Sequence, residues 1–181
     1  MESSRVSLAQ QRPRRQPQRL RVVPAEQADG GRPTPPESAG GRRVLVVDDE
    51  RSIRLLCRVN LQLAGFEVIE AANGRDALAA ISRETPDLVV LDVMMPDVDG
   101  WEVARRLAAD AATSEIPIVF LSARAAQDDR RRGAELGAVD YVVKPFDPLA
   151  LAERLGRTLE RIDRGEREAL RHELLEDDLR A

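Results

Sequence analysis

Short apolar runs alternate with amphipathic stretches along the chain from residue 42 onward. Residues 44–47, 88–91, 118–121 and 141–143 form continuous apolar runs, which are typical of strands buried on both faces of a sheet. A weaker run over 67–70 carries glutamates at both ends, which favours a strand at the edge of the sheet. The pattern therefore predicts five strands.

Helical periodicity fills the segments between these runs, because apolar residues recur there at spacings of three and four. The fourth and fifth helices are expected over 126–136 and 149–162, and the first three follow the stripes Ile53, Leu56, Cys57, Leu61 and Ala64; Ala77, Leu78 and Ile81; and Val103, Ala104 and Leu107. Each parallel pair of strands needs a helical crossover, so the alternation predicts an α/β fold with a doubly wound, five-stranded parallel sheet.

The segments at the two ends of the chain have a different character. Residues 1–41 hold six of the eleven prolines and seven arginines against four acids, without periodicity, so we expect a disordered basic tail. A basic arm that contacts an acidic partner is the alternative. The folded domain is expected over 42–163. Residues 164–181 are expected to form a short charged helical tail, which either lengthens the fifth helix or packs on a partner through a leucine stripe.

Composition narrows the classes of function. Only 3% of the residues are aromatic, and residues 42–181 carry a net charge of -7 against +3 for residues 1–41, so a nucleic-acid-binding surface is not expected. The single cysteine, Cys57, excludes an internal disulfide. No apolar run approaches the roughly 20 residues that span a bilayer, and no signal peptide is recognisable. We therefore expect a cytoplasmic protein that does not enter a membrane.

Polar residues that carry chemistry follow directly after the apolar runs. Asp48 and Asp49 follow the first, Asp92 the third, Ser122 the fourth and Lys144 the fifth. Ligands of such sheets bind at the carboxyl ends of the strands, where we expect these five side chains to meet. Three carboxylates repel one another unless a cation lies among them, and oxygen ligands favour Mg²⁺.

Four stretches in this order resemble the receiver domain of two-component response regulators. They are residues 47–50 (VDDE), 91–100 (LDVMMPDVDG), 121–123 (LSA) and 140–146 (DYVVKPF), and the resemblance runs from about residue 43 to 161. It implies a flavodoxin-like receiver fold with strand order 2-1-3-4-5. It also implies a cis peptide bond before Pro145.

The resemblance implies a role for each of these residues. Asp92 accepts a phosphoryl group, and Mg²⁺ is held by Asp48, Asp49, Asp92 and the backbone carbonyl of Met94. Lys144 neutralises one phosphoryl oxygen and Ser122 hydrogen-bonds another, while Ser122 and Tyr141 act as the switch pair. Composition supports the role of Lys144 separately, because it is the only lysine in a chain whose other 27 cationic side chains are all arginine.

The expected function is that of a phosphoacceptor, not of an enzyme acting on other substrates. A sensor histidine kinase or a phosphotransfer protein would donate the phosphoryl group, and Met94 and Arg124 stand where faster relatives carry residues that orient water, so slow autodephosphorylation is expected. Dehalogenase-like phosphatases are disfavoured, since they place a second aspartate where this chain has Met94.

The sequence allows two forms of output. Only nineteen residues follow Ile162, whereas a DNA-reading domain needs about 50, so a stand-alone receiver that signals to an unknown downstream protein is favoured. It would be a monomer or a weak, phosphorylation-dependent dimer. The alternative is a transcriptional response regulator that acts through dimerisation or DNA contact.

Overall fold

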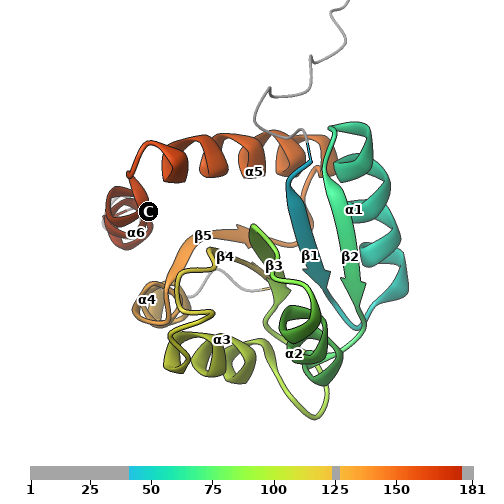
Figure 1. The fold of residues 1–181 in the computed structure, drawn as a ribbon, viewed down its shortest axis with the longest axis horizontal. Helices are drawn as coiled ribbons and strands as arrows, with labels where there is room; N and C mark the ends of the chain where they lie inside the picture. The colour runs from blue at the N-terminus through green and yellow to red at the C-terminus, as the bar shows by residue number, and fades with distance from the viewer. Residues whose placement is uncertain (1–40, 124–126, 177–181) are drawn as a thin grey trace, which may run out of the picture. The chain divides into compact units, whose positions relative to one another are not determined.

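The computed structural model describes residues 41–123 and 127–176, and the tail expected over 1–41 lies outside them apart from Gly41. Five parallel strands form one sheet in the order β2-β1-β3-β4-β5, which confirms the expected fold and strand order (Figure 1). The strands are β1 (Arg43–Val47), β2 (Glu67–Ala71), β3 (Leu88–Asp92), β4 (Ile118–Ser122) and β5 (Ala138–Val143).

Helices cover both faces of this sheet. Helices α1 (Arg51–Leu63) and α5 (Pro148–Asp163) lie on one face, and α2 (Gly74–Arg83), α3 (Gly100–Ala109) and α4 (Gln127–Glu135) lie on the other (Figure 1). Right-handed crossovers between parallel strands place helices on both faces in this way. No helix in the described part of the chain is long and apolar enough to cross a membrane.

Strand side chains divide between two apolar cores according to their alternation. In β1, Leu45 and Val47 enter the core beneath α2, α3 and α4, whereas Val44 and Val46 enter the core beneath α1 and α5. All five residues of β3 are buried, as expected of a central strand. In β2, Glu67 and Glu70 are exposed, which confirms the expected edge strand.

Side-chain caps set the starting points of three helices. Asn73 accepts a hydrogen bond from the Asp76 backbone amide at the start of α2, and Asp99 does the same for Glu102 at the start of α3. Asp147 caps α5 through the amide of Leu149. Such caps satisfy amides that have no partner within the helix. They fix where the chain leaves each loop at the carboxyl edge of the sheet.

A sixth helix, α6 (Arg167–Glu176), packs against β5 and α4. It does not lengthen α5, because the chain turns at Gly165, which has a φ of 79°. Leu170 joins the core beneath α1 and α5, and Leu174 joins the core on the opposite face. Helix α6 therefore lies across the edge of the sheet at β5, where the strand order ends. The sequence predicts a short charged helix here that lengthens the fifth helix or packs on a partner, whereas the structure packs it on its own domain.

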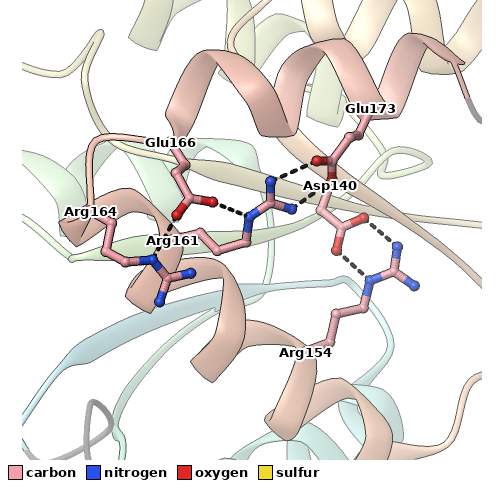
Figure 2. Close-up of polar contacts among 6 residues, drawn as sticks. All are labelled: Asp140, Arg154, Arg161, Arg164, Glu166 and Glu173. Atoms are coloured by element: carbon pink, nitrogen blue, oxygen red, sulfur yellow. Dashed lines mark hydrogen bonds and ion pairs between the residues drawn. The ribbon is translucent and has the colours of Figure 1, made fainter.

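Ion pairs tie α6 to the end of α5 (Figure 2). Arg161 bonds Glu166 through Nε at 2.9 Å and Glu173 through its two terminal nitrogens at 2.6 and 2.7 Å. Exposed pairs of this kind contribute only about 0–1 kcal/mol each. Burial of the α6 leucines must therefore supply most of the free energy that holds this helix in place.

Candidate functional site

The carboxyl edge of the sheet brings together residues from four separate segments. Asp48 follows β1, Asp92 ends β3, Ser122 ends β4 and Lys144 follows β5. The Lys144 Nζ lies 2.6 Å from Asp48 Oδ2 and 2.9 Å from Asp92 Oδ1, while the Lys144 backbone amide donates to the Ser122 carbonyl at 2.7 Å. One lysine thus connects two aspartates that are far apart in the sequence.

Three carboxylates form a compact oxygen cluster at this edge. Asp48, Asp49 and Asp92 each offer one oxygen, and these oxygens all lie within 4.8 Å of one another. Asp48 and Asp92 are buried and Asp49 is exposed. Three acidic side chains therefore stand beside a single lysine, Lys144. Hard oxygen ligands and negative charge are what Mg²⁺ requires, so the residues present fit this ion.

Hydrogen bonds hold the Asp48 carboxylate from two sides. Its Oδ1 accepts from the Glu50 backbone amide at 2.9 Å, and its Oδ2 accepts from Lys144. The side chain is fully buried, so an unpaired charge there would be costly. These two partners satisfy both oxygens of the buried Asp48 carboxyl group.

For both Asp92 and Lys144, burial shifts the pKa in one direction and hydrogen bonding shifts it in the other. Burial raises the pKa of the Asp92 carboxyl, and the hydrogen bond from Lys144 offsets only part of this effect. Burial also works to lower the pKa of Lys144, but its hydrogen bonds to Asp48 and Asp92 outweigh that effect, so the pKa of Lys144 is raised. Lys144 is therefore cationic at neutral pH.

Ser122 and Tyr141, the expected switch pair, are both buried. Tyr141 is only 4% exposed, and burial raises its pKa, while the neighbouring Ser122 side chain opposes that shift. Its ring lies 6.2 Å from the ring of Phe120, which in turn lies 4.6 Å from Trp101. The pair is thus connected by packed aromatic rings to the start of α3.

Glycine is required at position 100 because α3 begins against the backbone of Asp92. A Cβ at this position would lie 2.2 Å from the Asp92 carbonyl oxygen and 3.0 Å from the Val93 Cα. No flexible side chain is involved, so the backbone that carries Asp92 would have to move.

Replacement of Gly100 by alanine is expected to destabilise the protein by about 1–3 kcal/mol, the usual cost of overpacking. In a helix position with free space the same change stabilises by up to about 1 kcal/mol, so the sign of the effect is diagnostic. Urea unfolding of the wild type and of Gly100→Ala measures it. An increase in stability would contradict the close approach.

The remaining expected features differ in how far the structure describes them. The Lys144–Pro145 peptide bond is cis, as the resemblance implied. Met94 is 73% exposed, so its side chain lies largely in solvent. Arg124 lies outside the described residues. Cys57 is buried, and burial raises the pKa of its thiol to about 12, so the thiolate nucleophile is suppressed.

Sequence reasoning missed Arg54, which contacts the turn that carries the first two acids. Its Nη1 donates to the carbonyl oxygens of Asp48 at 2.7 Å and of Asp49 at 3.1 Å. The side chain is only 15% exposed. In a chain so rich in arginine, the sequence offers no signal that distinguishes this one from the others.

Comparisons with known proteins find relatives of this chain in both sequence and fold. The family model described as "Response regulator receiver domain" matches residues 44–156. The chain is 45% identical over 129 residues to the phosphate regulon transcriptional regulatory protein PhoB of Pseudomonas aeruginosa, a match that covers 71% of this chain and 56% of PhoB. It is 46% identical over 122 residues to the probable transcriptional regulator ycf27 of Porphyridium aerugineum, covering 67% of this chain and 50% of that protein.

Among solved structures, the chemotaxis protein CheY4 of Vibrio cholerae is similar to this chain with a TM-score of 0.63 and 35% identity. The match covers 66% of this chain and 99% of CheY4. By contrast, the chain spans about half the length of the two curated relatives that it matches. The similarity to those relatives thus concerns one part of each of them.

Proposed function

The chain belongs to the response regulator receiver domain family, and from this premise we propose that it is a Mg²⁺-dependent phosphoacceptor whose Asp92 receives a phosphoryl group. A sensor histidine kinase or a phosphotransfer protein is the proposed donor. The observation that carries the proposal is the position of Lys144, whose Nζ bonds both Asp48 and Asp92 at the edge where the acids cluster.

Each residue of the site has a distinct part in the proposed transfer. The Asp92 carboxylate oxygen attacks phosphorus, and the bond from phosphorus to the donor's nitrogen or oxygen breaks as the acyl phosphate forms. Lys144 neutralises charge on one phosphoryl oxygen, and the Ser122 hydroxyl donates to another. Asp48, Asp49, Asp92 and the Met94 carbonyl would hold Mg²⁺. The bound ion supplies further neutralisation of the phosphoryl oxygens.

Incubation with acetyl phosphate and Mg²⁺ is expected to add one phosphoryl group to the protein, as read by intact mass. Asp92→Asn matches the acceptor in size but removes its nucleophile, so this variant should gain no mass. Chelation of the metal with EDTA should also abolish the gain. Labelling that persists in Asp92→Asn, or in the presence of EDTA, would refute the assignment of this site.

The chain is proposed to catalyse only its own phosphorylation and its own slow dephosphorylation. Met94 and Arg124 carry neither an amide nor an acid that would orient an attacking water, which supports slow autodephosphorylation. The loss of the added mass with time, measured after removal of acetyl phosphate and without a phosphatase, tests this. Complete loss within seconds would contradict it.

The proposed output is phosphorylation-dependent contact with another protein. Residues 42–163 form one receiver domain, and α6 packs on its strand β5. A single domain of this kind supports signalling through its surface to another protein. The alternative is transcriptional output through dimerisation or DNA contact, which the names of the two curated relatives favour. Light scattering of the phosphorylated protein and binding to mixed duplex DNA distinguish the two. A tight dimer with sequence-selective DNA binding would establish the alternative.

A further inference from the structure

Arg54 contacts the back of the turn from which two of the three clustered acids project. A single nitrogen, Nη1, donates to the carbonyl oxygens of two consecutive residues, Asp48 and Asp49. In this turn between β1 and α1, the Asp48 amide donates to the Ala71 carbonyl at 3.3 Å, whereas the Asp48 and Asp49 carbonyls accept from Arg54. Arg54 therefore supplies a constraint that regular secondary structure does not supply at this point.

The guanidinium of Arg54 is itself held from the edge strand. Glu70 on β2 lies 3.9 Å from the Arg54 Nε, and Arg58 bonds the same glutamate at 2.8 Å. Arg54 also donates its backbone amide to the Glu50 carbonyl at 3.2 Å, within the first turn of α1. The backbone and the guanidinium of Arg54 are thus both held in place, so this side chain can in turn hold the turn that carries Asp48 and Asp49.

We propose that Arg54 is a positioning residue for the Mg²⁺ site, which it serves by holding the Asp48 and Asp49 carbonyls and so orienting the two carboxylates toward Asp92. This inference rests on the proposed function, since it concerns the same site. A peptide whose carbonyl is fixed cannot rotate, and the direction in which the attached side chain leaves the turn is then set. Groups that orient metal ligands in this way typically change metal affinity by 10–100-fold when removed.

Electrostatic repulsion alone would make removal of Arg54 strengthen Mg²⁺ binding, which is the opposite of the effect expected from positioning. Arg54 is a cation close to a cation site, so its repulsion weakens Mg²⁺ binding. If charge were its only contribution, removing the guanidinium would strengthen binding. If Arg54 orients the carboxylates, removing it weakens binding in spite of the lost repulsion. The sign of the change in Mg²⁺ affinity therefore separates the two contributions.

The experiment is an isothermal calorimetric titration of the whole 181-residue chain with Mg²⁺ alone. Arg54→Met keeps an unbranched side chain and removes the donors, and we expect its dissociation constant for Mg²⁺ to rise about tenfold. The matched control is Arg58→Met, which loses the same charge and a contact to the same Glu70 from the same helix but has no contact with the acidic turn. Its affinity should stay equal to that of the wild type or become slightly tighter.

Two further measurements separate positioning from general damage. Arg54→Lys keeps one charged donor, so its affinity should lie between the wild type and Arg54→Met. The Mg²⁺ concentration for half-maximal phosphorylation by acetyl phosphate should rise in Arg54→Met, while the rate at saturating Mg²⁺ returns toward that of the wild type. A rate that stays low at saturation would indicate disruption of the whole site and would overturn the proposal.

The outcomes also separate this inference from the function on which it rests. If the wild type binds Mg²⁺ and is phosphorylated, but Arg54→Met binds the ion equally or more tightly, the positioning role is wrong and the proposed function stands. If the wild type neither binds Mg²⁺ nor gains a phosphoryl group, the proposed function fails first. Weaker binding in Arg54→Met, together with unchanged binding in Arg58→Met, supports the positioning role.

Discussion

Replacement of Lys144 by methionine is expected to slow phosphorylation of Asp92 by about 10²–10³-fold, the usual loss when one group that stabilises developing charge is removed. The ammonium bonds Asp48 at 2.6 Å and Asp92 at 2.9 Å, so it lies beside the oxygen that would attack phosphorus. Time courses of intact mass with acetyl phosphate at saturating Mg²⁺ measure the effect.

Two controls show which property of Lys144 is responsible. Lys144→Met should bind Mg²⁺ more tightly than the wild type, because a competing cation is lost, so a slow rate would not reflect a missing metal. Lys144→Arg keeps the charge but replaces a compact ammonium by a broad planar fork, and we expect it to remain at least about tenfold slow. A rate for Lys144→Met within about threefold of the wild type would remove Lys144 from the reaction.

Replacement of Leu174 by alanine is expected to lower the free energy of unfolding by about 2–4 kcal/mol, as is usual for a buried leucine. Leu174 is 6% exposed and belongs to the core beneath α2, α3 and α4, although it lies in the last helix of the described chain. Chemical denaturation measures the change. It tests whether α6 is an integral part of the domain.

Leu175, the next residue of the same helix, is the matched control because it is 38% exposed. Leu175→Ala should change the stability by less than about 0.5 kcal/mol. If α6 detaches as a unit, Leu170→Ala combined with Leu174→Ala will cost less than the sum of the two single changes. Equal stabilities of the Leu174 and Leu175 variants would show that α6 is a loosely attached tail.

The fold and most of the site follow from local patterns in the sequence. Continuous apolar runs such as 88–91 can be buried only between two layers of helices, and that requirement leads to a parallel sheet. In such a sheet the residues at the carboxyl ends of the strands lie along one edge, so Asp48, Asp92 and Lys144 are expected together. Lys144 lies within hydrogen-bond distance of both aspartates. Topology converts three distant positions into one site.

Tertiary structure alone decided the features that depend on which surfaces meet. The sequence pattern of Leu170 and Leu174 is the same whether α6 packs on its own domain or on a partner. The folded structure shows that α6 packs at the β5 edge of its own sheet. The sequence does not distinguish Arg54 from the other arginines, because its contacts with the Asp48 and Asp49 carbonyls exist only in the folded chain. Periodicity records which side of an element is apolar, but contacts between elements depend on distances that arise only when the chain is folded.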